Sequence, residues 1–307
     1  MTELSPGSSM IEEPTPFRGI LLCTSAYGLL SLQDAAMKWL VDEQSVTVSL
    51  FWRSASVLLV CLVLGRGAMI GEIMRSQGRG SVVFRAFVSI IAWILYYSAA
   101  RHLDLAEMTT LYFSAPVMVI VLAAVVLKER ANRLQWMAVM LGFIGVVVAA
   151  RPDRISEPRA AAMVLLAAML WAYGYILLRQ LQGRMTVGSQ VLLTNLVFVI
   201  VTGITLPWQG GLPGADQIGL MALVGLVGGL GQFALFASFT RTSATVLAPF
   251  EYTGLIWAYL LSTAIWGAPP SPSLIAGALF ISVSGVLGIY GANRLSRARR
   301  SRPARMD

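Results

Sequence analysis

The sequence predicts an all-α integral membrane protein with ten transmembrane helices in two inverted five-helix repeats. Of its 307 residues, 57% are hydrophobic and only 12% are charged, whereas about a quarter of the residues of a soluble domain are charged. Apolar runs of about 20 residues, the length that crosses a bilayer, follow one another along the chain. The connections between them are short and leave no room for a separate soluble catalytic domain.

Glycine, proline and charged residues separate the apolar runs and delimit the predicted spans. The spans are expected at 17–39, 46–65, 82–101, 105–126, 134–150, 158–179, 186–207, 217–239, 245–266 and 273–291. Residues 1–16 contain three glutamates and no lysine or arginine, which is not the basic start of a signal peptide. We therefore expect 1–16 to be an N-terminal tail and the arginine-rich 292–307 to be a C-terminal tail.

Basic residues indicate the orientation. Most of the 23 lysines and arginines fall in the connections on the N-terminal side of the membrane and in the C-terminal tail. Cytoplasmic connections of membrane proteins are enriched in these residues, so both termini are expected to be cytoplasmic. The net charge of +8 is thereby explained by topology and by contact of the tail with anionic lipid, and no nucleic-acid partner is expected.

The sequence contains no motif that indicates an enzyme. Cys23 and Cys61 lie inside apolar runs, and the single histidine, His102, has no Cys/His cluster around it in the sequence. No phosphate-binding glycine loop and no serine-hydrolase motif occurs. We expect no enzymatic activity, no cofactor, no disulfide framework and no metal site.

Two pairs of segments resemble each other across the halves of the chain. LQWMAVMLGFIGVVV (134–148) resembles LIAGALFISVSGVLG (274–288), and 111–130 aligns with 250–269. These pairs divide the chain into two repeats of five spans.

The repeats are expected to cover 17–151 and 158–291. Because five is odd, the second copy enters the membrane in the opposite sense to the first. Inverted repeats of this kind are typical of secondary transporters, whose substrate site lies near the middle of the bilayer between the halves.

The residues also resemble a known family. YYSAARHLDLAEMTTLYFSAPVMVIVLAAVVLKER (96–130) looks like the third and fourth helices of EamA-type members of the drug/metabolite transporter superfamily. APFEYTGLIWAYLLSTAIWG (248–267) looks like the matching part of the second repeat, and FWRS (51–54) also fits. The resemblance implies a carrier of small metabolites in a bacterial inner membrane. Similar proteins export amino acids, and others import S-adenosylmethionine or riboflavin.

One departure from the family pattern is visible. The second repeat has Trp266-Gly267-Ala268 where the first has Lys128-Glu129. The acidic position is lost in the second half, which argues against a symmetric role for the two helix ends.

Three charges lie inside the first two spans. Asp34 and Lys38 share one helical face, and Arg53 is expected at about the depth of Asp34. We predict that Asp34 faces Arg53 or Lys38 in a neutralising ion pair that fixes the packing of the two spans. The alternative to a structural ion pair is that these charges serve gating or proton coupling.

Glu251 is the most informative charge. It aligns with Tyr112 of the first half, and no lysine or arginine occurs between Arg241 and Arg294. A charge inside a span is costly and indicates a functional site, and desolvation would favour the neutral acid. Glu251 is thus the candidate for proton coupling or for binding a substrate ammonium; a structural, hydrogen-bonded acid is the alternative.

Aromatic residues near the middle of several spans favour a substrate pathway over interfacial anchoring. Amphipathic rings suit a solute with polar and apolar parts and can contact an ammonium; plain packing is the alternative. Prolines inside spans 4 and 9, Pro116 and Pro249, are expected to kink their helices. The predicted pathway residues are Trp93, Tyr97, Tyr112, Trp171, Tyr175, Gln232, Glu251, Tyr252 and Trp257.

These patterns predict a secondary transporter that works by alternating access and exports amino acids, aromatic and neutral ones included. Its expected partners are the small-molecule substrate, the lipid bilayer and, as one open alternative for coupling, protons. Uptake of S-adenosylmethionine or of a vitamin such as riboflavin is the alternative within transport. A non-transporting membrane assembly protein is the alternative from another class.

Overall fold

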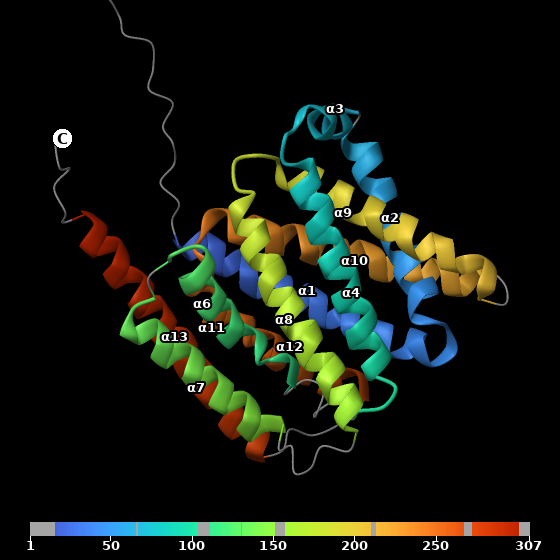
Figure 1. Ribbon diagram of the computed structural model, residues 1–307. Helices are drawn as coiled ribbons and strands as arrows, with labels where there is room; N and C mark the ends of the chain where they lie inside the picture. Colours follow the sequence, from blue (N-terminus) through green and yellow to red (C-terminus); the bar gives the residue numbers. More distant parts are fainter. Residues whose placement is uncertain are drawn as a thin grey trace, which may run out of the picture.

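The computed structural model describes residues 16–65, 67–103, 111–129, 131–150, 157–209, 213–266 and 272–300, and within them it is helical throughout apart from short turns. The predicted all-α membrane protein is confirmed. The first half of the chain forms α1 (Pro16–Glu43), α2 (Val46–Gly65), α3 (Ala68–Arg75), α4 (Arg79–Ala99), α6 (Ala115–Val126) and α7 (Arg133–Ala150) (Figure 1).

The second half continues the bundle with helices of similar length. They are α8 (Pro158–Gln180), α9 (Val187–Thr205) with the short 3-10 turn η1 (Leu206–Trp208), α10 (Ala215–Arg241), α11 (Ala244–Glu251), α12 (Thr253–Trp266) and α13 (Pro272–Arg300). Among the described residues, seven segments are long and apolar enough to cross a membrane, and three apolar helices, within α6, α7 and α13, are shorter.

The helices differ from the predicted spans in three places. α1 extends to Glu43 and α13 to Arg300, beyond the expected ends at 39 and 291. α3 was not predicted: Met69 and Ile73 face the protein while Ile70 and Met74 are exposed. This amphipathic pattern is typical of a helix lying at a membrane interface, and its eight residues are too few to register as a span.

The two prolines act differently from each other. Pro249 lies inside α11, which ends two residues later at Glu251, and α12 begins at Thr253. Pro116 instead occupies the first turn of α6, where a helix has no hydrogen bond for the missing N–H to break. The expected kink at Pro116 is therefore corrected to a helix start.

The main helix contacts correspond when the two halves are exchanged. α1 packs against α10 as α8 packs against α4, and α2 packs against α10 as α9 packs against α4. α1 contacts α11 and α12 as α8 contacts α6, while α2 pairs with α9 and α7 with α13. Figure 1 shows α7 and α13 side by side along one edge of the bundle. The middle of the bundle is thus formed by α1, α4, α6, α8, α10 and α11.

One glycine lets α10 approach α1 closely. A Cβ atom on Gly228 would lie 1.6 Å from Oε1 of Gln33, so no larger residue fits there without displacing that side chain. Small residues serve this purpose in membrane helices generally. Here the close approach positions Gln33 in the interior of the bundle.

Candidate functional site

A continuous group of aromatic rings connects α4, α8 and Tyr112, just before α6, in the middle of the bundle. The ring of Trp171 lies 5.3 Å from that of Trp93, 5.5 Å from that of Tyr96 and 5.0 Å from that of Tyr112, each edge-on. Trp93 in turn lies 5.2 Å from Tyr97. Tyr96 and Tyr97 are buried, whereas Trp93, Tyr112 and Trp171 remain partly accessible. We call these five residues the aromatic column.

The first carboxylate near the column is Glu251, at the end of α11, which is only 1% exposed. The hydroxyl of Tyr27, on α1, donates a hydrogen bond of 2.7 Å to Oε2 of Glu251. The other oxygen, Oε1, is buried and has no hydrogen-bond partner. No described lysine or arginine forms an ion pair with this carboxylate.

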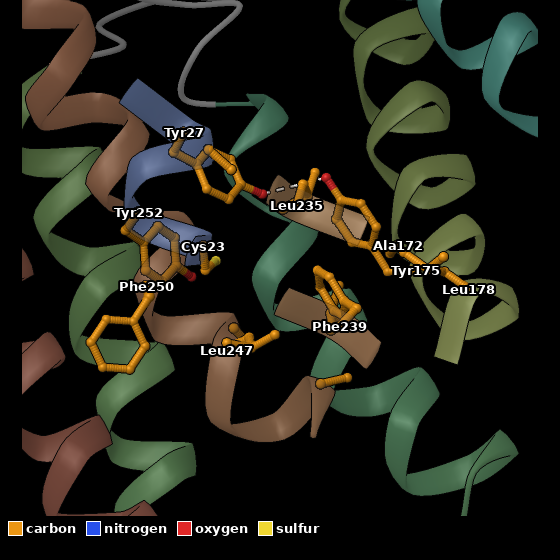
Figure 2. Close-up of a cluster of buried hydrophobic side chains, with 14 of the residues drawn as sticks. Cys23, Tyr27, Ala172, Tyr175, Leu178, Leu235, Phe239, Leu247, Phe250 and Tyr252 are labelled. Atoms are coloured by element: carbon orange, nitrogen blue, oxygen red, sulfur yellow. Dashed lines mark hydrogen bonds between the residues drawn. The ribbon is translucent and has the colours of Figure 1, made fainter. Parts of the chain in front are cut away.

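Tyr27, from the first half of the chain, also lies between Glu251 and a second residue of the second half, Tyr175. Its hydroxyl oxygen lies 3.4 Å from that of Tyr175 on α8, and Figure 2 shows the two hydroxyls facing each other. The ring of Tyr175 stacks on Phe239 of α10 at 4.6 Å. Four helices, α1, α8, α10 and α11, therefore meet around this carboxylate.

The second carboxylate is Asp34, one turn from the end of the apolar part of α1. The hydroxyl of Tyr97 donates to Oδ1 of Asp34 at 2.7 Å. Arg53, on α2, donates from Nε to Oε1 of Gln33 at 2.7 Å, and its Cζ lies 4.8 Å from the centre of the Trp93 ring.

The predicted ion pair between Asp34 and Arg53 does not form: among the described residues no nitrogen of Arg53 lies within 4.0 Å of Asp34. Each group instead bonds a neutral side chain, because Gln33 and Tyr97 lie between and beside the two charges. The side chain of Lys38, the other expected partner, lies outside the described residues.

Ring contacts join the surroundings of the two carboxylates. Tyr112 lies 5.3 Å from Phe113, and Phe113 lies 5.9 Å from Tyr252, the neighbour of Glu251 in sequence. Through Phe113, ring contacts therefore continue from the aromatic column to Tyr252. One acid lies at each end of this series of rings: Asp34, bonded by Tyr97, and Glu251, next to Tyr252 in sequence.

Three predicted pathway residues have other surroundings. Oε1 of Gln232 accepts a hydrogen bond of 2.9 Å from Nδ2 of Asn195, which ties α10 to α9. Trp257 is 37% exposed and packs over Gly28 of α1. Tyr252 is fully buried against Gly142, and its hydroxyl has no hydrogen-bond partner.

Several residues with interior polar contacts, among them Tyr27, Gln33 and Arg85, were not singled out from the sequence. Tyr27 was missed because an isolated tyrosine in an apolar run carries no signal of its partner. Arg85, near the start of the span expected at 82–101, carried no predicted contact, and it is 2% exposed inside α4. Its Nη2 donates to Thr194 at 2.7 Å, and its Cζ lies 4.2 Å from the centre of the Phe236 ring.

The ends of α6, α8 and α10 are joined by one arginine. Nε of Arg179 lies 3.4 Å from Oε1 of Glu129, and Nη1 donates to Gln182 and to the carbonyl of Phe239 at 3.0 Å. Lys128, before Glu129, has φ of 54°, a left-handed conformation that non-glycine residues adopt only when surrounding contacts hold them. This turn brings Glu129 to Arg179. The corresponding positions of the second half, Gly267 and Ala268, lie outside the described residues.

Comparison with known proteins identifies the architecture. The EamA-like transporter family model matches residues 17–151 and again 158–291, which confirms the resemblance found in the sequence. A crystal structure of another protein superposes with a TM-score of 0.73 at 16% identity, covering 91% of this chain and 96% of that one. At that identity the likeness concerns the fold alone.

Several curated proteins are similar over most of the chain. The pseudopaline exporter CntI of Pseudomonas aeruginosa is 28% identical over 277 residues, 87% of this chain and 94% of that protein. Protein RarD of Streptomyces exfoliatus is 27% identical, covering 94% and 92%. The S-adenosylmethionine uptake transporter of Rickettsia conorii is 26% identical, covering 68% and 74%.

Proposed function

This chain belongs to the EamA-like transporter family and is a secondary transporter of small metabolites rather than an enzyme, and on that premise we propose that it exports amino acids across a bacterial inner membrane. The proposed mechanism is alternating access: the two halves rock against each other around a site in the middle of the bundle.

The proposed arrangement is ten spans in two inverted repeats, with both termini cytoplasmic. Three observations support it: two family matches of similar length, main helix contacts that correspond when the halves are exchanged, and the concentration of basic residues on one side. α11 and α12 together form the ninth span in this arrangement.

The observation that carries the substrate proposal is the aromatic column with a tyrosine-bonded carboxylate at each end. An amino acid has an ammonium group, which carboxylates bind directly and aromatic faces attract. Its side chain, when aromatic or apolar, gains from contact with Trp93, Tyr112 and Trp171, the partly accessible rings. A site of this composition suits solutes that combine a cationic group with apolar surface.

Uptake of S-adenosylmethionine is the second candidate. It is favoured by the likeness to the uptake transporter of Rickettsia conorii, as export is favoured by the likeness to the exporter CntI. Riboflavin uptake belongs to the same alternative.

Counterflow in proteoliposomes tests the proposal. Vesicles preloaded with one unlabelled amino acid are diluted into the labelled compound, with and without an imposed proton gradient, and labelled S-adenosylmethionine and riboflavin serve as parallel substrates. We expect accumulation of labelled phenylalanine or leucine above that of protein-free vesicles. Accumulation of S-adenosylmethionine or riboflavin alone would contradict the amino-acid assignment.

A further inference from the structure

Hydrogen-bond donors without acceptors gather where α1 meets α2. Nε2 of Gln33, Nε1 of Trp52 and Nη1 of Arg53 are buried, and none has a hydrogen-bond partner. Gln33 and Arg53 are joined to each other through Oε1 and Nε, and Trp52 is the neighbour of Arg53 in the helix. Buried polar groups are normally bonded, so unpaired donors on Gln33 and Arg53, which are bonded to each other, favour a ligand that brings acceptor oxygens.

A negative charge lies beside these donors but forms no ion pair with Arg53. Asp34 follows Gln33 in the chain, yet it bonds to Tyr97 while Arg53 bonds to Gln33. Opposite charges attract strongly in a medium of low dielectric constant, and only fixed neighbours keep them from pairing. Tyr97 supplies a hydrogen bond for the acid, and the close approach of α10 at Gly228 holds the side chain of Gln33 against the arginine.

Two opposite charges that are held apart are complementary to a molecule that itself carries both. An arginine is the preferred partner of a carboxylate because its planar group offers several parallel donors. A carboxylate that accepts from a tyrosine keeps acceptor capacity for an ammonium. Trp93, under the Arg53 guanidinium, begins the aromatic column, so a side chain attached between the two charged groups would have aromatic surface beside it.

We propose that Asp34 and Arg53 form the head-group site of this transporter: Arg53, with Gln33, binds the carboxylate of a zwitterionic amino acid, and Asp34 binds its ammonium. This inference rests on the proposed function and adds which chemical groups are recognised and where. Glu251 is not part of this site: Arg53 lies close enough to Asp34 to interact with its charge, whereas no described arginine or lysine lies so near Glu251. Glu251 would then have a separate role, such as proton coupling.

Single-charge analogues test the head-group site directly. Counterflow of labelled phenylalanine is measured against unlabelled phenethylamine, which lacks the carboxylate, and phenylpropionate, which lacks the ammonium. For the unmodified protein we expect phenylalanine to compete at least about tenfold better than either analogue, since each loses a charge-assisted hydrogen bond. If either analogue competed as well as phenylalanine, the head-group site would be wrong, although the protein could still transport amino acids.

Substitutions then test which residue binds the carboxylate of the amino acid and which binds its ammonium. In Arg53→Gln, half-maximal counterflow should require about tenfold more phenylalanine, and phenethylamine should compete as well as phenylalanine. In Asp34→Asn, phenylpropionate should compete as well as phenylalanine, because the group that binds the ammonium has lost its charge. Arg85→Gln is the matched control, because it removes another buried guanidinium from the bundle and should leave the preference for phenylalanine unchanged.

A folding check keeps the result interpretable. Each purified variant is examined by size-exclusion chromatography, and ligand binding is measured separately as the rise in its unfolding temperature with phenylalanine. Should Arg53→Gln fail to fold, Tyr97→Phe removes only the hydroxyl that bonds Asp34 and should still weaken the response to phenylalanine. Unchanged responses in the folded variants would overturn the head-group site. Absence of any amino-acid flux in the unmodified protein, with S-adenosylmethionine or riboflavin transported, would instead overturn the proposed function.

Discussion

The hydroxyl of Tyr27 donates a 2.7 Å hydrogen bond to Glu251, a residue 224 positions further along the chain. The bond joins the first helix of the protein to the broken ninth span of the proposed arrangement. Alternating access requires the two halves to move relative to each other. A bond between them at a buried acid is therefore placed where movement and protonation can influence each other.

Replacing Glu251 by glutamine should impair transport more than folding. The amide can still accept the hydrogen bond from Tyr27, but it cannot release or take up a proton or balance an ammonium. We expect flux to fall at least about tenfold, the effect of losing one charge-assisted contact, while the protein stays monodisperse. Glu72→Gln makes the same chemical change outside the bundle interior and serves as the control. Equal flux for Glu251→Gln and the unmodified protein at every pH would remove Glu251 from the mechanism.

Replacing Trp171 by alanine should weaken transport of bulky solutes. Its ring contacts three members of the aromatic column, so its loss opens the column and removes apolar contact with a large side chain. The concentration needed for half-maximal counterflow should rise for phenylalanine and change little for alanine. Trp208→Ala removes a tryptophan that is 77% exposed and provides the comparison. If the phenylalanine concentration for half-maximal counterflow is the same in Trp171→Ala, then Trp171 contributes to helix packing and not to substrate binding.

Removing Arg179 should destabilise the protein more than removing Glu129. Both substitutions break the ion pair, but Arg179→Gln also loses the bond to the carbonyl of Phe239, which ties α8 to α10. Partly exposed ion pairs contribute about 0.2–1 kcal/mol, and a hydrogen bond to a charged group about 1.5–3 kcal/mol. Thermal unfolding of both single variants and the double variant checks the order. A larger loss from Glu129→Gln would contradict it.

The contribution of Glu72 to stability should depend on pH. Burial raises the pKa of this carboxyl, but hydrogen bonds from Ser189 and Thr186 at the start of α9 lower it by more, so its pKa lies below the ordinary value. A lowered pKa in the folded protein stabilises it above the ordinary carboxyl pKa of about 4.3, and the stabilisation is lost as pH falls through the folded-state value.

The measurement compares Glu72→Gln with the unmodified protein across pH. The difference in unfolding temperature should be full at pH 7, decline below about pH 4.3 and vanish in stronger acid. A difference that grows as the pH is lowered would show that the carboxyl acts through other contacts.

The sequence by itself was enough to predict the class of molecule, the positions of most helices and the family. Those properties depend on the length and polarity of contiguous runs, and a bilayer requires such runs to be long, apolar and helical. The same reasoning marked Asp34, Arg53 and Glu251, because any charge inside an apolar run is costly wherever it points.

Only the tertiary structure decided which groups meet. Glu251 bonds Tyr27, Gln232 bonds Asn195, and Asp34 bonds Tyr97 instead of Arg53. Each of these bonds joins different helices, and its geometry depends on how the helices rotate and how closely they approach. Such approach depends on small residues such as Gly228, whose effect acts across the bundle rather than along the chain. The separation of the Asp34 and Arg53 charges is therefore a property of packed helices, and no local sequence pattern encodes it.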